Sequence, residues 1–247
     1  RLAAPWDQSG VQVAASNKKI PRMAVMLDPT LESVRKAVGA GCDFLPCHHP
    51  LSMKARFPDS TGPYHEILSL LFRNDVCLYS AHTSLDASPH GTAAWLAGIL
   101  ALTGASVLEP TGIYQDEQAG FGFVGDLPQE LPYDDFCKKL ASAIEKDSWR
   151  ACGPQPEKIR RVACCPGSGS DMIDEAGRAG ADVYITGDMK YHAALDTAYA
   201  GIRVLDVGHF QLEEIMMRLL AERMEKELGD LKVSFLASSD PLVFEKY

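Results

Sequence analysis

The chain has 247 residues, of which 46% are hydrophobic and 23% charged, as is ordinary for a globular protein with a sizeable core. A formal net charge of -9 argues against generic binding to nucleic acid or to an anionic membrane, because there is no basic surplus. The seven cysteines form no CxxC pair, and no apolar run is long enough to span a membrane. We expect a soluble, cytoplasmic protein with reduced thiols and without a signal peptide. Residues upstream of Arg1 are also expected, since the sequence does not start with methionine.

Short apolar runs alternate with helical patterns along the chain. The runs are RMAVML (22–27), CDFLPC (42–47), VCLYSA (76–81), RVACC (161–165), DVYIT (182–186) and IRVLDV (202–207). They lack polar alternation, which is typical of strands in a mostly parallel sheet that is covered on both faces. Helices are expected over residues 30–38, 63–72, 133–146, 170–179 and 212–228. This alternation predicts a layered α/β fold.

The two ends of the chain carry related patterns. AGCD (40–43) and AGAD (179–182) each stand between a helix and a strand. When DVCLYSAHTSLD (75–86) is aligned with IRVLDVGHFQLE (202–213), His82 meets His209 and Asp86 meets Glu213. We therefore predict one domain over 1–247, with pseudo-repeat halves at 1–103 and 159–247. The less regular segment 104–158 would connect them, without an inserted extra domain.

Candidate metal ligands follow several of the predicted strands. His209 and Glu213 are four residues apart, so one helical turn would place both on the same face. Asp86 could be a ligand or a helix N-cap, and His48-His49 could be ligands or loop residues. At one edge of a sheet, all five could hold two ions about 3.5–4 Å apart, with one of the adjacent imidazoles directed to each ion.

Five ordered motifs carry a resemblance to a known family: PWDQSGVQV, CHHPL, AHTSLD, TGDMKYHAALDTA and VGHFQLE. Over nearly its whole length the chain resembles the Nif-three-like family, known also as GTP cyclohydrolase 1 type 2 or dinuclear metal centre proteins. The resemblance implies a duplicated three-layer α/β/α fold, two related lobes that share one metal site, and a homohexamer built as a trimer of dimers.

The same resemblance implies which residues bind metal. Glu213 would bridge two divalent ions (Zn, Mn, Fe or Ni). His49 and Asp86 would hold one ion, and His48 and His209 the other. Gln8 and Ser84 replace the asparagines that are usual in the family, and SMKARF follows CHHPL in place of an apolar pair. These departures leave the proposed ligands unchanged and bear on the choice of substrate.

Other residues are candidates for supporting roles. His82 could orient the site or move protons, or it could be a buried structural histidine. Asp188 and His192 are candidates for general acid-base catalysis, although a surface cap and a packed histidine would also explain them. PGSGSD opens a helix, where Gly167, Ser168 and Gly169 could bind phosphate or form a tight turn. WDQSG (6–10) is expected to be a structural corner.

Two classes of function fit these residues. The first is a metal-dependent hydrolase acting on a small molecule such as a nucleotide, or on another phosphorylated or heterocyclic substrate. GTP ring opening is implied by the resemblance. The alternative is a non-catalytic metal-binding ring that serves as a scaffold, metal chaperone or regulatory module. An open coordination position would favour the enzyme, and closed coordination the structural role.

Overall fold

The structure is a computed structural model that describes residues 2–16, 19–91, 93–243 and 245. The chain divides into two compact α/β units. The first unit contains Ala3–Leu85 and Met216–Tyr247, and the second contains Asp86–Ile215 together with Leu2. These boundaries differ from the predicted halves, because the chain returns to the first unit at its C-terminal end and segment 104–158 lies wholly within the second.

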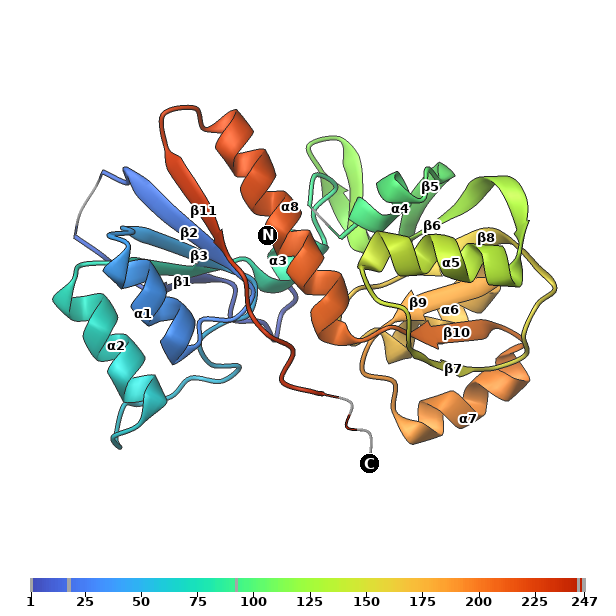
Figure 1. The fold of residues 1–247 in the computed structure, drawn as a ribbon, viewed down its shortest axis with the longest axis horizontal. Coiled ribbons are helices and arrows are strands. Elements are labelled where there is room, and N and C mark those ends of the chain that lie inside the picture. Colours follow the sequence, from blue (N-terminus) through green and yellow to red (C-terminus); the bar gives the residue numbers. More distant parts are fainter. Residues whose placement is uncertain (1, 17–18, 92, 244, 246–247) are drawn as a thin grey trace. The chain divides into compact units, whose positions relative to one another are not determined.

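The first unit is built on a five-stranded sheet with the order β1-β4-β3-β2-β11. Its strands are β1 (Gly10–Val13), β2 (Arg22–Met26), β3 (Phe44–Cys47), β4 (Cys77–Ser80) and β11 (Lys232–Leu236). All neighbouring pairs are parallel except β1 and β4. The C-terminal strand β11 lies beside β2, which Figure 1 shows as a red arrow next to a blue one. Strands β2, β3 and β4 confirm three of the predicted apolar runs.

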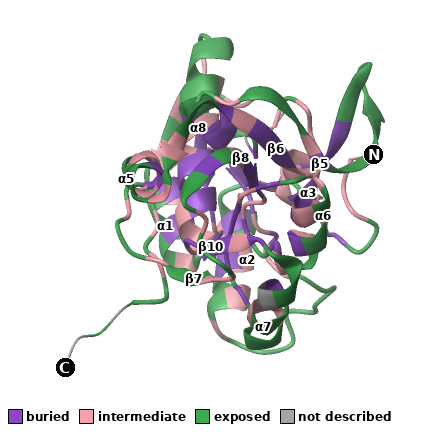
Figure 2. Cartoon of the chain, turned by 90° about the vertical axis from the view of Figure 1, so that its right-hand side faces the viewer, coloured by how far each residue is buried: buried purple, intermediate pink, exposed green. Residues whose placement is uncertain are grey.

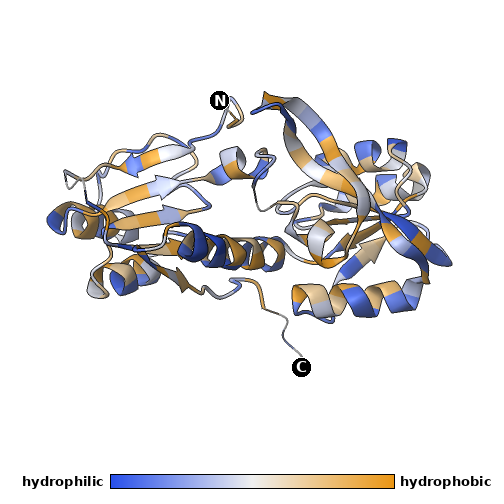
Figure 3. Ribbon diagram, turned by 90° about the horizontal axis from the view of Figure 1, so that it is seen from above, coloured by the Kyte–Doolittle hydropathy of each residue, from blue (hydrophilic) through white to orange (hydrophobic). Residues whose placement is uncertain are grey.

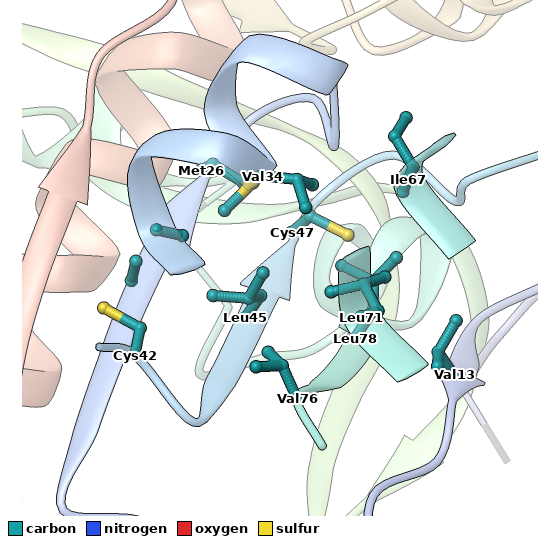
Figure 4. Packing of buried hydrophobic residues seen from close by; sticks show 12 residues of the cluster. Val13, Met26, Val34, Cys42, Leu45, Cys47, Ile67, Leu71, Val76 and Leu78 are labelled. Carbon is teal, nitrogen blue, oxygen red and sulfur yellow. The ribbon is translucent and has the colours of Figure 1, made fainter. Parts of the chain in front are cut away.

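Helices α1 (Leu31–Gly39) and α2 (Pro63–Arg73) pack together beside this sheet (Figure 1). The Thr30 side chain caps α1 by accepting a hydrogen bond from Ser33 N, at 3.1 Å. Apolar side chains from the strands and both helices form the core shown in Figure 4, which includes Met26, Val34, Leu45, Leu71 and Leu78. Burial of these side chains is the main stabilising contribution to the unit.

The second unit is built on a six-stranded sheet with the order β5-β6-β8-β9-β10-β7. Three central strands are parallel, and the outer pairings are antiparallel. The strands are β5 (Thr103–Tyr114), β6 (Glu117–Pro132), β7 (Arg150–Cys152), β8 (Lys158–Cys164), β9 (Val183–Thr186) and β10 (Arg203–Asp206). The expectation of an irregular segment at 104–158 is wrong. Most residues of β5 are exposed, so this strand does not contain the continuous apolar run by which the other strands were predicted.

Helices accompany this sheet as well. They include α4 (Trp95–Ile99), α5 (Tyr133–Ile144), α6 (Ile173–Arg178), which follows the 3-10 turn Ser170–Met172, and α7 (Tyr191–Ala200). Figure 2 shows buried residues concentrated on strands and inner helix faces, and Figure 3 shows the helices as mixtures of hydrophobic and hydrophilic residues. Helix α5 confirms its predicted position and buries Phe136, Leu140 and Ile144.

Two helices contain the points where the chain passes from one unit to the other. Helix α3 (His82–Asp86) contains the boundary between Leu85 and Asp86, and α8 (His209–Glu227) contains the boundary between Ile215 and Met216. Each begins with one of the two histidines that the proposed duplication aligns. The duplication itself stays a prediction. Among the described helices, none combines the length and apolar character needed to cross a membrane.

Candidate metal centre

Three histidines converge in the first unit, and we call His48, His49 and His82 the histidine cluster. His48 is fully buried, with 0% of its surface exposed, and follows directly after β3. One ligand nitrogen from each ring lies within 4.8 Å of the others. The ring of His82 is centred 5.2 Å from that of His48 and 5.6 Å from that of His49. The structure therefore groups the adjacent histidines with a residue that the sequence placed only in a supporting role.

The backbone around His48 and His49 is fixed by the end of β2. The amide N–H groups of both residues donate to Leu27 O, at 3.2 and 3.1 Å. Ser80 Oγ, at the end of β4, donates to His48 O at 2.8 Å. The cluster is thus placed by three adjacent strand ends, as expected for sites in α/β sheets.

An aspartate holds one nitrogen of His49. His49 Nδ1 lies 2.8 Å from Asp28 Oδ1, and Asp28 stands two residues after β2. An ionised carboxylate can only accept hydrogen bonds, so Nδ1 donates to Asp28 and Nε2 is the nitrogen directed away from it. Second-sphere carboxylates of this kind orient metal-binding histidines in many proteins.

Asp7 bonds to Nδ1 of His82 as Asp28 bonds to Nδ1 of His49: Asp7 Oδ1 lies 2.7 Å from His82 Nδ1. The Asp7 carboxylate is buried and also accepts from Gln8 N, Ser9 Oγ, and both Thr83 N and Thr83 Oγ1. Burial alone would raise the pKa of Asp7, but the hydrogen bonds from Ser9, Thr83 and His82 outweigh it and lower that pKa well below its usual range. The WDQSG segment therefore contributes Asp7, which holds the His82 ring in a fixed orientation.

The second unit contains His209 and Glu213 on the first turns of α8. His209 Nε2 lies 2.8 Å from Glu213 Oε2, which confirms that one helical turn brings the two side chains together. His209 Nδ1 lies 2.7 Å from Asp188 Oδ2. Glu213 is only 4% exposed. Asp188 thus holds the His209 ring in place, and the acid-base role expected for Asp188 stays a prediction.

The loop after β8 approaches the Glu213 side chain closely at Gly167. A Cβ atom added at Gly167, where φ is +73°, would lie 2.4 Å from Glu213 Oε1. Gly187 N donates to Gly167 O, and Gly169 N donates to Thr186 Oγ1 at 3.0 Å. These bonds fit the tight-turn interpretation of PGSGSD. Phosphate binding by Gly167, Ser168 and Gly169 stays a prediction.

Asp86 ends helix α3 and begins the second unit. Burial raises the pKa of the Cys165 thiol, and the negative charges of Asp86 and Glu213 raise it further. Both carboxylates therefore lie near the same thiol within this unit. His192 is exposed on α7, where its ring is centred 5.4 Å from that of Tyr191, and its acid-base role stays a prediction.

Sequence reasoning missed the aspartates that support the histidines. Besides Asp7 and Asp28, buried Asp206 accepts hydrogen bonds from Met189 N at 3.1 Å and Gly208 N at 3.2 Å. It also pairs with Arg150. These contacts fix the segments on either side of the Asp188–His209 bond. Asp28 and Asp206 stand at the carboxyl ends of strands, which is the signal that would have found them.

The donor atoms present suit divalent transition metals. The histidine cluster offers imidazole nitrogens, and the second unit offers an imidazole with two carboxylates, at His209, Glu213 and Asp86. Zinc, manganese, iron and nickel all accept this combination. The aspartates behind His49 and His209 are the second-sphere partners that such ligands usually have. The residues therefore fit a metal centre.

The profile of the Duf34/NIF3 (NGG1p interacting factor 3) family matches residues 1–241. The chain belongs to this family. Among curated relatives, the GTP cyclohydrolase 1 type 2 homolog of Deinococcus radiodurans is 35% identical over 235 residues, which cover 93% of this chain and 85% of the relative. The homolog of the same name from Clostridium perfringens is 31% identical over 244 residues, which cover 97% and 92%.

Solved structures of Duf34/NIF3 relatives share the fold. Reduced HcgD from Methanocaldococcus jannaschii aligns with a TM-score of 0.81 and 29% identity, covering 95% of this chain and 91% of that one. A Bacillus cereus protein related to NIF3 aligns with a TM-score of 0.87 at 23% identity, covering 99% and 94%. The family resemblance and the α/β fold class predicted from sequence are thereby confirmed.

Proposed function

We propose that the chain is a dinuclear metal-dependent hydrolase whose ligands are His48, His49, Asp86, His209 and Glu213. The observation that carries the proposal is shared by His49 and His209. Each has its Nδ1 bonded to an aspartate, at 2.8 and 2.7 Å. Two histidines from distant parts of the chain thus have the second-sphere partner of a metal ligand.

The residues of the chain would prepare this centre for hydrolysis. Asp28 and Asp188 bond to Nδ1 of His49 and His209 and so fix the orientation of each ring. A metal ion bound to Nε2 of His209 would take the place of the proton that this nitrogen now shares with Glu213 Oε2, 2.8 Å away. Glu213 supplies a buried carboxylate that can bridge. When bound, divalent ions supply Lewis-acid polarisation of a substrate and lower the pKa of water towards neutrality.

We propose an anionic small molecule as the substrate, with a nucleotide as the first candidate. The relatives named above are called GTP cyclohydrolase 1 type 2 homologs, which makes GTP ring opening the first reaction to test. The segment after His49 also exposes two cations, Lys54 and Arg56. The Arg56 guanidinium lies over the Tyr64 ring, 4.6 Å from its centroid, and would be held ready for phosphate.

Elemental analysis of the purified protein tests the metal centre. We expect about two divalent ions per chain, with loss of bound metal in Glu213→Ala and in His49→Ala. His65→Ala is the matched control, because His65 lies on α2 outside the candidate site. A wild-type chain that stays metal-free after reconstitution would overturn the proposal.

A nucleotide panel that includes GTP then tests for hydrolysis. We expect turnover that depends on added metal and is lost in Glu213→Ala. A loaded protein that binds two ions but converts no substrate would favour the alternative of a scaffold, chaperone or regulatory module.

The proposed homohexamer predicts a light-scattering mass six times the 26.9 kDa of one chain.

A further inference from the structure

We infer that the outer face of helix α7 binds the same face of a second copy of this chain. Three residues on this face carry the argument, and we call Tyr191, Leu195 and Tyr199 the α7 stripe. The two helices would run antiparallel, with a twofold axis passing beside Leu195. The inference needs neither metal nor catalysis. It goes beyond the proposed function by assigning a contact surface to the self-association of the chain.

The first argument is that α7 is apolar on both of its faces. On the inner face, Ala193 and Ala194 pack against the core of the second unit and Thr197 is fully buried. On the outer face, the three members of the α7 stripe are 73%, 49% and 91% exposed, and Figure 2 shows much of α7 as exposed. They are four residues apart, so they form one row along the helix. A helix that is apolar all round is normally buried all round, so we expect a partner to cover the outer face.

Helix α5 of the same unit shows the contrasting pattern of a helix that faces water. It exposes Asp134, Asp135 and Lys138 opposite its buried side chains. In α7, Asp196 is the only aspartate, glutamate, lysine or arginine. The chain as a whole has a net charge of -9, so most of its surfaces would repel a second copy. The outer face of α7 can approach its own copy with few charges to desolvate.

The second argument is that the α7 stripe is complementary to itself. A tyrosine stands four residues before Leu195 and another stands four residues after it, so the pattern reads the same in both directions. In an antiparallel pair, Tyr191 would meet the partner's Tyr199, and the same contact would occur again across the axis. A twofold interface requires a patch of this kind. Rows of side chains spaced by four residues also interdigitate in the commonest class of helix packing.

The third argument is the size of the exposed apolar surface. A buried aromatic side chain covers about 150–250 Å², so the exposed parts of the α7 stripe offer roughly 400 Å². That area is in the range of functional patches on protein surfaces. It is about half of the roughly 800 Å² that each partner contributes to a standard interface. The stripe would form the apolar centre of the contact, and exposed neighbours such as His192 and Asp196 its polar rim.

Exchange of charge at Leu195 tests the twofold contact, because a residue beside the axis meets its own copy. Leu195→Glu would bring two carboxylates together, and Leu195→Lys two ammonium groups. Each variant alone should therefore self-associate at least tenfold more weakly than the wild type. An equal mixture of the two variants pairs opposite charges and should recover the association. Sedimentation equilibrium measures the dissociation constants. The matched controls are Phe72→Glu and Phe72→Lys, since Phe72 is an exposed apolar residue on α2.

Crosslinking gives a second, independent measurement of the contact. Leu195→Cys would place two thiols close together across the axis, so a short bifunctional maleimide should join two chains. Lys138→Cys, on the exposed face of α5, should give no more two-chain product than the wild type with its native cysteines. Circular dichroism on every variant checks that the fold is retained.

Two results would overturn the inference: no recovery of association in the mixed Leu195 variants, or equal crosslinking of Leu195→Cys and Lys138→Cys. Either result in a chain that still forms hexamers would place the contacts of the hexamer elsewhere. A monomeric wild type would overturn both the α7 contact and the proposed homohexamer. Metal content and hydrolysis are measured separately, so the proposed metal centre is judged on its own results.

Discussion

His209 Nδ1 and Asp188 Oδ2 lie 2.7 Å apart, and this bond joins the first residue of α8 to the loop after β9. Asp188 adopts a φ of 53°, which non-glycine residues adopt rarely. Asp206 holds the neighbouring Met189 and Gly208 amides. Two loops that follow adjacent parallel strands are therefore fixed to each other around one imidazole.

Asp188→Asn tests whether this bond orients a metal ligand. Asparagine keeps the shape of the side chain but loses the charge that holds the Nδ1 proton. We expect metal affinity to fall about 10–100-fold with the fold intact. Competition against a chromophoric chelator measures the affinity. Asp196→Asn, on the exposed side of α7, is the control, and equal affinities in the two variants would refute the role.

Gly167→Ala tests the close approach of the loop after β8 to the Glu213 side chain. Gly167 and Gly180 have nearly the same φ, +73° and +72°, but a Cβ atom would meet Glu213 Oε1 at 2.4 Å only at Gly167 and finds open space at Gly180. Both alanine variants should lose about 1–2 kcal/mol of unfolding free energy to backbone strain. Only Gly167→Ala should also lose bound metal. Urea unfolding and elemental analysis on both variants separate strain from displacement of Glu213, and normal metal content in Gly167→Ala would contradict the clash.

Asp206→Ala tests the support beneath the Asp188–His209 bond. It removes the acceptor of two amide N–H groups and an ion-pair partner, so we expect a loss of about 2–4 kcal/mol of unfolding free energy. Arg150→Ala should cost less than about 1 kcal/mol, because the Arg150 side chain is 67% exposed. Urea denaturation measures both. Similar losses in the two variants would show that the ion pair, and not the amide bonds, stabilises this corner.

Asp7→Asn tests the pH dependence that follows from the lowered pKa of Asp7. The carboxyl is ionised in the folded protein at a pH where the unfolded chain, with a pKa of about 3.9, already binds a proton. Its contribution to stability is therefore present above about pH 4 and is lost as the pH falls towards the lowered folded pKa. We expect the wild type to be more stable than Asp7→Asn at pH 7, with the difference shrinking below about pH 4. Urea unfolding of metal-free protein across this pH range would contradict the argument if the difference stayed constant.

The sequence predicted the central elements of the fold well. The apolar runs at 22–27 and 182–186 are β2 and β9, because strands buried on both faces need continuous apolar side chains. Strands β5 and β6 were missed, since β5 is largely exposed and β6 contains Gly120, Gly122 and Gly125. Their pairing comes from backbone hydrogen bonds between strands, which leave little trace in residue type.

The candidate site could be predicted from sequence only where its contacts are local in the chain. The spacing of His209 and Glu213 is a local helical property, so their contact could be read from sequence. The bond between Asp7 and His82 joins residues 75 positions apart, and no local pattern reports it. Asp28 was not among the predicted site residues, because its contact with His49 depends on the register of β2 and β3.

The chain passes between its units after Leu85 and after Ile215, inside helices α3 and α8, whereas domain boundaries usually fall in flexible linkers. Cutting the chain at either passage to express one unit alone would sever a helix that begins with His82 or His209. A split-protein design or a tag inserted there would damage the candidate centre directly. The two-residue turn at Gln115 and Asp116, between β5 and β6, is exposed and interrupts neither helix, so it is the position at which a reporter domain can be inserted.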